Sequence, residues 1–117
     1  MNIKRHKVGP RMAQANICNG IAFLSGQVPK NSLDQDITAQ AREVLAAIDA
    51  LLAEIGSDKS HMLSCQVFLR DMADFDQWNA VWDQWVDAAR TPARTTVQAV
   101  MARPQCRVEV TVTAACA

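Results

Sequence analysis

The chain has 117 residues, half of them apolar and 21% charged, which is the usual balance of one globular domain. Twelve basic and twelve acidic side chains cancel, which argues against a nucleic-acid-binding surface because such surfaces carry a basic excess. No stretch approaches the roughly 20 apolar residues of a membrane helix, and the basic start MNIKRHKVGP lacks the apolar segment of a secretory signal. We expect one cytoplasmic domain over residues 1–117, with no membrane and no nucleic-acid partner.

Two strands joined by a tight turn are expected near the start of the chain. Asn19-Gly20 separates two apolar runs, and this pair favours the positive φ angles of a two-residue hairpin turn. We therefore place strands over about 12–18 and 21–25. The next segment, SGQVPKNSLDQD, is rich in turn-forming residues and indicates a loop.

A long helix is the clearest element of the sequence. Apolar residues recur at three- and four-residue spacing from residue 37 to residue 55 and form one continuous face. Asp36 stands where an N-cap would begin this helix, and Gly56 stands where a C-terminal stop would end it.

A strand is expected at 63–70, followed by a second helix in DMADFDQWNAVWDQWV. Phe75, Trp78, Trp82 and Trp85 lie close to one face of that helix. Such a row is either an aromatic ligand platform or core packing against a sheet, and core packing is the commoner arrangement.

Two last strands, over about 94–101 and 107–114, give the order β-β-α-β-α-β-β. Two helices and one mixed sheet form a two-layer α+β sandwich with both helices on one face. Alternation sends Val108, Val110 and Val112 to one face, while Phe68, or Phe23 with Ile21, points to the other. Apolar side chains on an uncovered sheet face predict self-association.

The cysteines and histidines suggest no metal or disulfide chemistry. The four cysteines are Cys18, Cys65, Cys106 and Cys116, and no two form a CxxC pair. We expect reduced thiols that pack as small apolar groups. His6 and His61 lack zinc-ligand spacing, so no metal is expected.

Two charges stand inside expected strands and need a reason. Arg94 leads the run RTTV, and Glu109 lies within CRVEVTVTA. The two side chains either pair with each other or solvent at a sheet edge, which contributes little to stability, or they serve a ligand. In the second interpretation Arg94 grips a planar carboxylate with two parallel hydrogen bonds. Glu109 then holds a water or exchanges a proton at the neighbouring carbon.

Several blocks of the chain together resemble the Rid/YjgF family of reactive-intermediate imine deaminases, some members of which are called endoribonuclease L-PSP or translation inhibitor. The blocks are GPRMAQANICNGIAFLSGQVP, DITAQAREVLAAIDALLAEIGSDKS, VFLRDMADFDQWNAVW, PARTTV and RVEV. They follow the family's order and cover about Val8 to Ala114.

The resemblance implies a chorismate-mutase-like subunit, a homotrimer with ligand clefts between subunits, and hydrolysis of enamines and imines of small 2-keto acids without a cofactor. The residues that match the family's motifs are Arg94 for the substrate carboxylate, Glu109 for the attacking water, and Ser25, Asn79, Thr95 and Thr96 around the cleft. A tyrosine usually follows the Gly-Pro pair in such deaminases. Here Arg11 or Met12 takes its place, so Arg11 is a further candidate for the cleft.

Other readings of the same residues remain open. One is a non-catalytic trimer that binds small carboxylates through Arg94, which the missing tyrosine favours, whereas the retained Glu109 favours catalysis. The other is RNA cleavage, which rests on names used in the family. The neutral charge and the lack of a basic patch with interleaved aromatics weigh against it.

Overall fold

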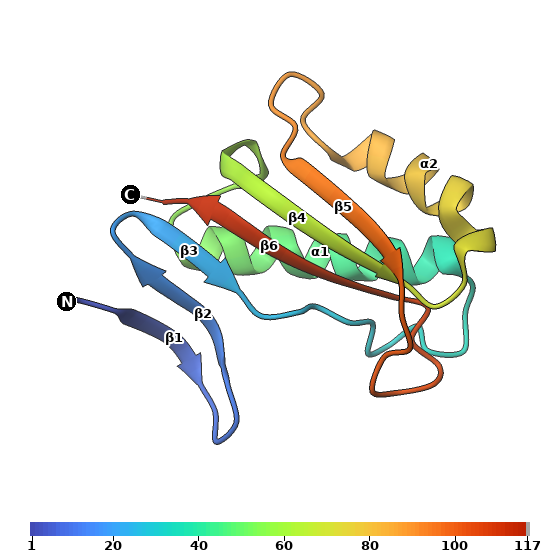
Figure 1. Ribbon diagram of the computed structural model, residues 1–117, viewed down its shortest axis with the longest axis horizontal. Helices are drawn as coiled ribbons and strands as arrows, with labels where there is room; N and C mark the ends of the chain where they lie inside the picture. The colour runs from blue at the N-terminus through green and yellow to red at the C-terminus, as the bar shows by residue number, and fades with distance from the viewer. Residues whose placement is uncertain (117) are drawn as a thin grey trace.

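The computed structural model describes residues 1–116 and consists of six strands, two α-helices and two short 3₁₀ turns (Figure 1). The strands are β1 (Lys4–Val8), β2 (Ala13–Cys18), β3 (Ile21–Leu24), β4 (Met62–Leu69), β5 (Ala93–Gln98) and β6 (Val108–Ala115). The helices are α1 (Ile37–Glu54) and α2 (Phe75–Trp85), and the 3₁₀ turns are η1 (Lys59–His61) and η2 (Met72–Asp74).

The strands form one mixed sheet in the order β1-β2-β3-β6-β4-β5. β4 and β5 are parallel because α2 carries the chain back between them, and the other neighbouring pairs are antiparallel. Figure 1 shows α1 behind β6 and β4, with α2 beside β5. The predicted two-layer α+β fold is confirmed.

The core lies between the sheet and the helices. Val108, Val110 and Val112 alternate along β6 with half-buried polar residues and are almost fully buried. Trp78 of α2 is fully buried and packs at a tilted angle against Trp82, with ring centroids 5.9 Å apart. The tryptophan row is therefore mainly core packing, as expected.

Both predicted ends of α1 are confirmed. The Asp36 side chain accepts a hydrogen bond from the backbone N–H of Ala39, which satisfies one of the helix's unpaired donors. Gly56 has φ +78°, and the N–H groups of Gly56 and Ser57 bond to the carbonyls of Ala53 and Leu52. This is the Schellman arrangement, which glycine favours at positive φ.

The Asn19-Gly20 hairpin is also confirmed. Both residues have positive φ, 53° and 75°, and Cys18 pairs directly with Ile21 across the turn. A two-residue turn with both angles positive fits the right-handed twist of the flanking strands.

The strand count was wrong, because β1 was not predicted. Its sequence, KRHKV, is strongly basic and mostly exposed, so it lacks the alternation of apolar and polar residues that marks a half-buried strand. Within the part of the chain that the structure describes, β1 pairs only with β2 and is an edge strand, where lysine and arginine discourage pairing with other chains. The sheet therefore has one strand more than the order read from the sequence.

Glu54, at the end of α1, holds β1 against the helix layer. It accepts hydrogen bonds from His6 Nε2 at 2.7 Å and from Lys7 Nζ at 3.1 Å. Neighbouring side chains on a strand normally point to opposite faces, but Lys7 has φ +50°. This local kink brings His6 and Lys7 to the same carboxylate.

Replacing Glu54 with glutamine is expected to speed hydrogen–deuterium exchange in β1 severalfold. The hydrogen bonds from His6 and then Lys7 lower the pKa of Glu54. Because a lowered folded-state pKa stabilises the fold above the unfolded-state value, this contribution is lost as the pH falls through the folded-state pKa. In the wild type, the protection of the β1 amides relative to their intrinsic exchange rates should therefore fall only in acid. The control Asp83→Asn removes an exposed charge from α2, and equal effects of both changes would contradict a specific tether.

The second face of the sheet carries apolar side chains that no helix covers. Ile21 pairs with Ala115 and Phe23 pairs with Thr113, on the face opposite Val112 and Ala114. Phe23 is 54% exposed, and Phe68 of β4 is half-buried on the same face. Phe68 and the pair Phe23 and Ile21 therefore all lie on this uncovered face. An exposed apolar face of this kind supports the expectation of self-association.

Candidate functional site

Arg94 lies in β5 on the face that the helices cover. It pairs with the buried Cys65 of β4, and its own side chain is half-buried. Its Nη2 donates a hydrogen bond to Asn79 Oδ1 at 2.8 Å, and its Cζ lies 5.0 Å from the centre of the Trp82 ring. α2 therefore holds the guanidinium from the amide of one residue and the aromatic face of another.

Polar side chains of β5 contact α2 and the 3₁₀ turn η2 that precedes it. Arg94 meets Asn79 and Trp82, and four residues later Gln98 Oε1 accepts the backbone N–H of Met72 at 2.9 Å. Thr96 lies between them on the same face, with a buried hydroxyl. The helix face of β5 is thus polar where it docks the helix, which answers in part why an arginine begins this strand.

Arg94 has no carboxylate partner among residues 1–116. A half-buried guanidinium with one donor fixed and an indole ring beside its Cζ is prepared to receive a planar anion through its other donors.

Glu109 lies in β6 on the uncovered face of the sheet. It pairs with Phe68, and its side chain is half-buried. A methyl group built on Gly26 would stand 2.0 Å from Glu109 Oε2, so the carboxylate occupies the space beside this glycine. The segment that carries Gly26 is fixed by hydrogen bonds in both directions between the backbones of Gln27 and Val110.

Arg94 and Glu109 therefore lie on opposite faces of one sheet. Through β4 their positions are two strands and three residues apart, which places their Cα atoms about 14 Å from each other. The two side chains do not form an ion pair, so the interpretation in which they neutralise each other within one chain is wrong.

Ser25 belongs to the half of the site around Glu109. Its hydroxyl donates to Gln14 Oε1 at 3.2 Å, and Gln27 Nε2 donates to the Ser25 carbonyl at 3.1 Å. This small amide cluster lies one residue before Gly26 and fixes the start of the long loop.

The other candidates separate in the same way. Asn79 is joined to Arg94, as described, and Thr96 shares its face of β5, whereas Thr95 is exposed on the opposite face. Arg11 lies in the β1–β2 turn at the far end of the sheet from β5 and lines an open hollow of about 610 Å³ with Met12. One chain thus brings Arg94 to Asn79 and Glu109 to the Ser25 segment, while Arg11 shares its hollow with Gln14, the residue that accepts the Ser25 hydroxyl.

No nucleophilic thiol stands beside Arg94. Burial raises the pKa of Cys65 to about 12, and the nearby positive charge of Arg94 only partly opposes this. Burial also raises the pKa of Cys106, which is likewise buried. Cys18 and Cys116 are half-buried, and all four cysteines are unbridged. In residues 1–116, no group of His, Cys, Asp or Glu side chains is placed to hold a metal ion.

Two residues of the site were not predicted from the sequence. Trp82 was assigned to core packing alone, and the ring that packs on Trp78 also carries Arg94. Gly26 was taken as a loop residue, although the absence of its side chain makes room for Glu109. The role of Trp82 could have been predicted, because Asn79 and Trp82 are three residues apart and so lie on the same face of a helix. The contact of Gly26 with β6 has no local signal.

Comparison with known proteins places the chain in a family. Residues 6–116 match the family described as Endoribonuclease L-PSP. A RutC family protein from Haemophilus influenzae is 44% identical over 116 residues, which cover 99% of this chain and 100% of that protein. The RutC family protein YoaB from Escherichia coli K12 is 41% identical over 115 residues, covering 98% and 99% of the two chains. The chain belongs to the YjgF/L-PSP family.

The fold of this YjgF/L-PSP family member agrees with solved structures. NMB1025, a YjgF family protein from Neisseria meningitidis, superposes with a TM-score of 0.92 at 47% identity, covering 100% of this chain and 97% of that one. In residues 1–116, no helix combines the length and the apolar character needed to cross a membrane.

Replacing Gly26 with alanine is expected to displace the Glu109 carboxylate with little loss of stability. The new methyl group would meet the flexible end of the glutamate side chain before any backbone atom. The cost in the free energy of unfolding should therefore stay below about 1 kcal/mol. Urea denaturation measures this, and Gly9→Ala is the matched control, because the nearest atom there is the Met12 carbonyl at 3.3 Å. A large loss of stability for Gly26→Ala alone would show that the glycine serves the backbone.

Proposed function

We propose that this YjgF/L-PSP family protein hydrolyses reactive enamines and imines of small 2-keto acids and releases ammonia. The observation that carries the proposal is the half-buried guanidinium of Arg94, fixed by Asn79 and Trp82 and without a carboxylate partner in residues 1–116. A carboxylate adjacent to the reacting carbon is the group that such a guanidinium recognises best.

Glu109 would hold the attacking water. Its carboxylate has no ion pair among residues 1–116 and stands beside the Ser25–Gln27 segment. The water oxygen bonds to the imine carbon while its proton passes to the carboxylate, and Glu109 then returns the proton to the nitrogen. As the carbon–nitrogen bond breaks, the hydroxyl proton passes to the Glu109 carboxylate and from there to the departing ammonia, which leaves as ammonium while a keto group remains.

The reaction needs positioning more than a strong nucleophile. A protonated imine already attracts water, so orientation of the substrate carboxylate and of one water supplies the acceleration. This is consistent with the high pKa of the Cys65 thiol, which keeps that group neutral. We place the reaction in the cytoplasm, where reduced cysteines such as these persist.

In this proposal the two halves of the site come from different subunits. Within one chain the sheet separates Arg94 from Glu109, so a single small substrate cannot contact both. We propose a homotrimer in which the uncovered apolar face, with Phe23 and Phe68, is buried and each cleft joins Arg94 of one subunit to Glu109 of the next.

A competition assay tests the activity. A dehydratase acting on serine or threonine generates the imines of pyruvate and 2-ketobutyrate, and semicarbazide traps them. The wild-type protein should divert imine from semicarbazide to keto acid, and Arg94→Ala and Glu109→Gln should each reduce this by about 100-fold or more. Arg94→Lys keeps the positive charge but loses the planar guanidinium with its two parallel donors. Its imine-diverting activity should therefore be much closer to that of Arg94→Ala than to that of the wild type.

Two other results would redirect the assignment. If the wild type diverts no imine but binds 2-ketobutyrate in an Arg94-dependent way, the protein is a non-catalytic carboxylate binder. If it cleaves RNA, and Arg94→Ala still does so with activity that rises at low salt, the nuclease reading replaces both. Arg11 or Met12 stands where such deaminases usually have a tyrosine. Imines of other keto acids are therefore the next substrates to assay.

A further inference from the structure

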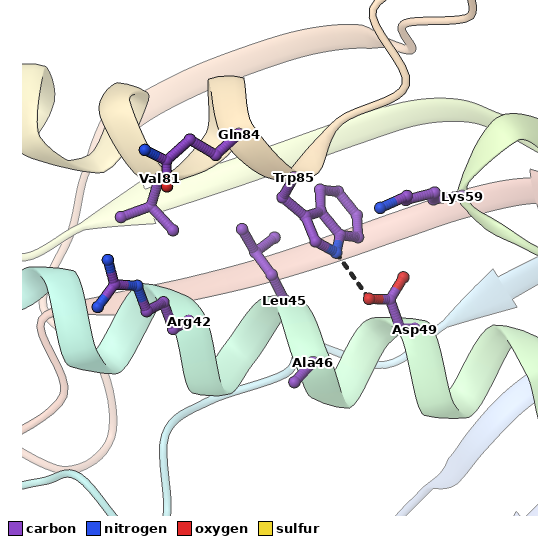
Figure 2. A pocket seen from close by; sticks show the side chains of 8 residues that line it. All are labelled: Arg42, Leu45, Ala46, Asp49, Lys59, Val81, Gln84 and Trp85. Atoms are coloured by element: carbon purple, nitrogen blue, oxygen red, sulfur yellow. Dashed lines mark hydrogen bonds between the residues drawn. The ribbon is translucent and has the colours of Figure 1, made fainter.

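The groove between α1 and α2 is a hollow that contains none of the residues assigned above. Figure 2 shows Arg42 and Gln84 at one end, Trp85, Asp49 and Lys59 at the other. The floor between them is formed by Leu45 and Val81. Its volume is about 250 Å³, just below the roughly 300–1,000 Å³ of pockets for drug-sized ligands, so it has room for a small ligand only.

The Trp85 ring is fixed as one wall of this groove. Its indole N–H donates to Asp49 Oδ2 at 2.8 Å, and Lys59 Nζ lies 5.2 Å from the ring centre (Figure 2). The hydrogen bond satisfies the polar atom of the ring, so the remaining ring surface offers a flat apolar contact. Trp85 itself is only half-buried, unlike Trp78 and Trp82.

The opposite end of the groove is a place for an anion. Arg42 is exposed on α1 and has no ion pair among residues 1–116. Figure 2 shows the Arg42 guanidinium and the Gln84 amide on the same side of the groove. A second hollow of about 160 Å³ shares Arg42, Val81 and Gln84 and adds Thr38 and Gln77, which carry further hydrogen-bond donors.

The charged contact at Arg42 and the apolar contact at Trp85 lie at opposite ends of the groove. Arg42 and Asp49 are seven residues apart on α1, which is about 10 Å along the helix axis. A ligand would therefore place its charged group at Arg42 and its apolar body over Leu45, Val81 and the Trp85 ring. With two cations and one carboxylate that already accepts a hydrogen bond, the groove has a net positive charge.

We propose that the α1–α2 groove is a second binding site, for a small carboxylate that carries a flat apolar body, and that Arg42 binds the carboxylate while Trp85 contacts the body. The site is independent of the proposed deaminase activity, because it shares no residue with Arg94, Glu109 or the Ser25 segment.

The test uses 3-phenylpropanoate, which has the carboxylate and the ring but no keto group. The full-length protein is titrated while the three tryptophan indole N–H signals are followed by NMR, with Trp85→Phe identifying the Trp85 signal. We expect a saturable shift of the Trp85 signal. Binding should weaken about tenfold in Arg42→Gln, since a charge-assisted pair is lost. It should weaken similarly when the uncharged 3-phenylpropanamide replaces the acid.

Arg94→Ala is the matched control and should leave the titration unchanged. The proposal is overturned if the Trp85 signal does not move, if it moves equally with acetate, or if Arg42→Gln binds as well as wild type. Loss of the shift in Arg94→Ala would assign the binding to the Arg94 site instead. Because Arg42 is exposed, Arg42→Gln should keep the wild-type melting temperature, which separates loss of binding from loss of fold.

Discussion

Replacing Gln40 with leucine is expected to lower the free energy of unfolding by about 3 kcal/mol, although leucine is apolar and the site is completely buried. Gln40 joins α1 to two loops. Its Oε1 accepts the backbone N–H of Arg107 at 2.7 Å, and its Nε2 donates to the Gln105 carbonyl at 3.0 Å. The same Nε2 also donates to the Gln35 carbonyl at 3.3 Å.

The cost comes from the groups that leucine would leave behind. The Arg107 N–H and the Gln105 carbonyl would lose their partner at this part-buried contact, and a polar group left unpaired there costs about 1–3 kcal/mol. Urea denaturation measures the change. Gln77→Leu is the control, because Gln77 is an exposed glutamine of α2 and glutamine and leucine have similar helix propensities.

The same substitution should also disturb the start of β6. Arg107 directly precedes that strand, so loosening its backbone moves the strand that carries Glu109. If Gln40→Leu proved as stable as Gln77→Leu, ordered waters or a shifted loop would be satisfying these groups, and Gln40 would not hold the two loops together.

Periodicity and turn chemistry predicted most of the fold because each signal is local. The Asn19-Gly20 turn, the Asp36 cap and the Gly56 stop each depend on a few neighbouring residues, and each is confirmed. β1 was missed because an exposed edge strand has no buried face to leave a pattern. Its position depends on Glu54, 48 residues further along the chain from His6.

The candidate site was harder to predict, because strand facing depends on register. Arg94 and Asn79 could be joined from the sequence only by the family resemblance, and the structure brings them within 2.8 Å. The facing of Arg94 is set by its pairing with Cys65, and that of Glu109 by its pairing with Phe68. Neither pairing has a signal in the strand that carries the charge, so the separation of the two charges could not be foreseen.

Two half-buried glutamates of this chain differ in the hydrogen bonds that they accept. Partial burial raises the pKa of Glu43, but hydrogen bonds from the Ser32 hydroxyl and from the backbone N–H groups of residues 30–32 outweigh it and lower the pKa overall. Glu43 is therefore fully used in holding the loop after β3. Glu109 has no such set of donors in residues 1–116, and a carboxylate that keeps its hydrogen-bonding capacity is the one suited to hold a water.

Mixing two inactive variants is expected to restore activity, if the proposed cleft joins two subunits. Arg94→Ala keeps Glu109, and Glu109→Gln keeps Arg94, so each homotrimer lacks a complete cleft. When the two are unfolded together and refolded at equal amounts, a cleft is complete wherever Arg94 of a Glu109→Gln subunit meets Glu109 of an Arg94→Ala subunit. Random assembly makes about a quarter of the clefts complete, since the interface is head-to-tail.

The recovered imine-diverting activity should therefore be about a quarter of the wild-type value, measured in the semicarbazide assay. Mixing the folded variants without unfolding is the control and should restore little activity until subunits exchange. No recovery from co-refolded protein whose trimers contain both variants would mean that Arg94 and Glu109 of one subunit serve the same cleft. The sheet would then have to bring its two faces to one substrate around the β5 edge, which the pairing of Arg94 with Asn79 on the helix side opposes.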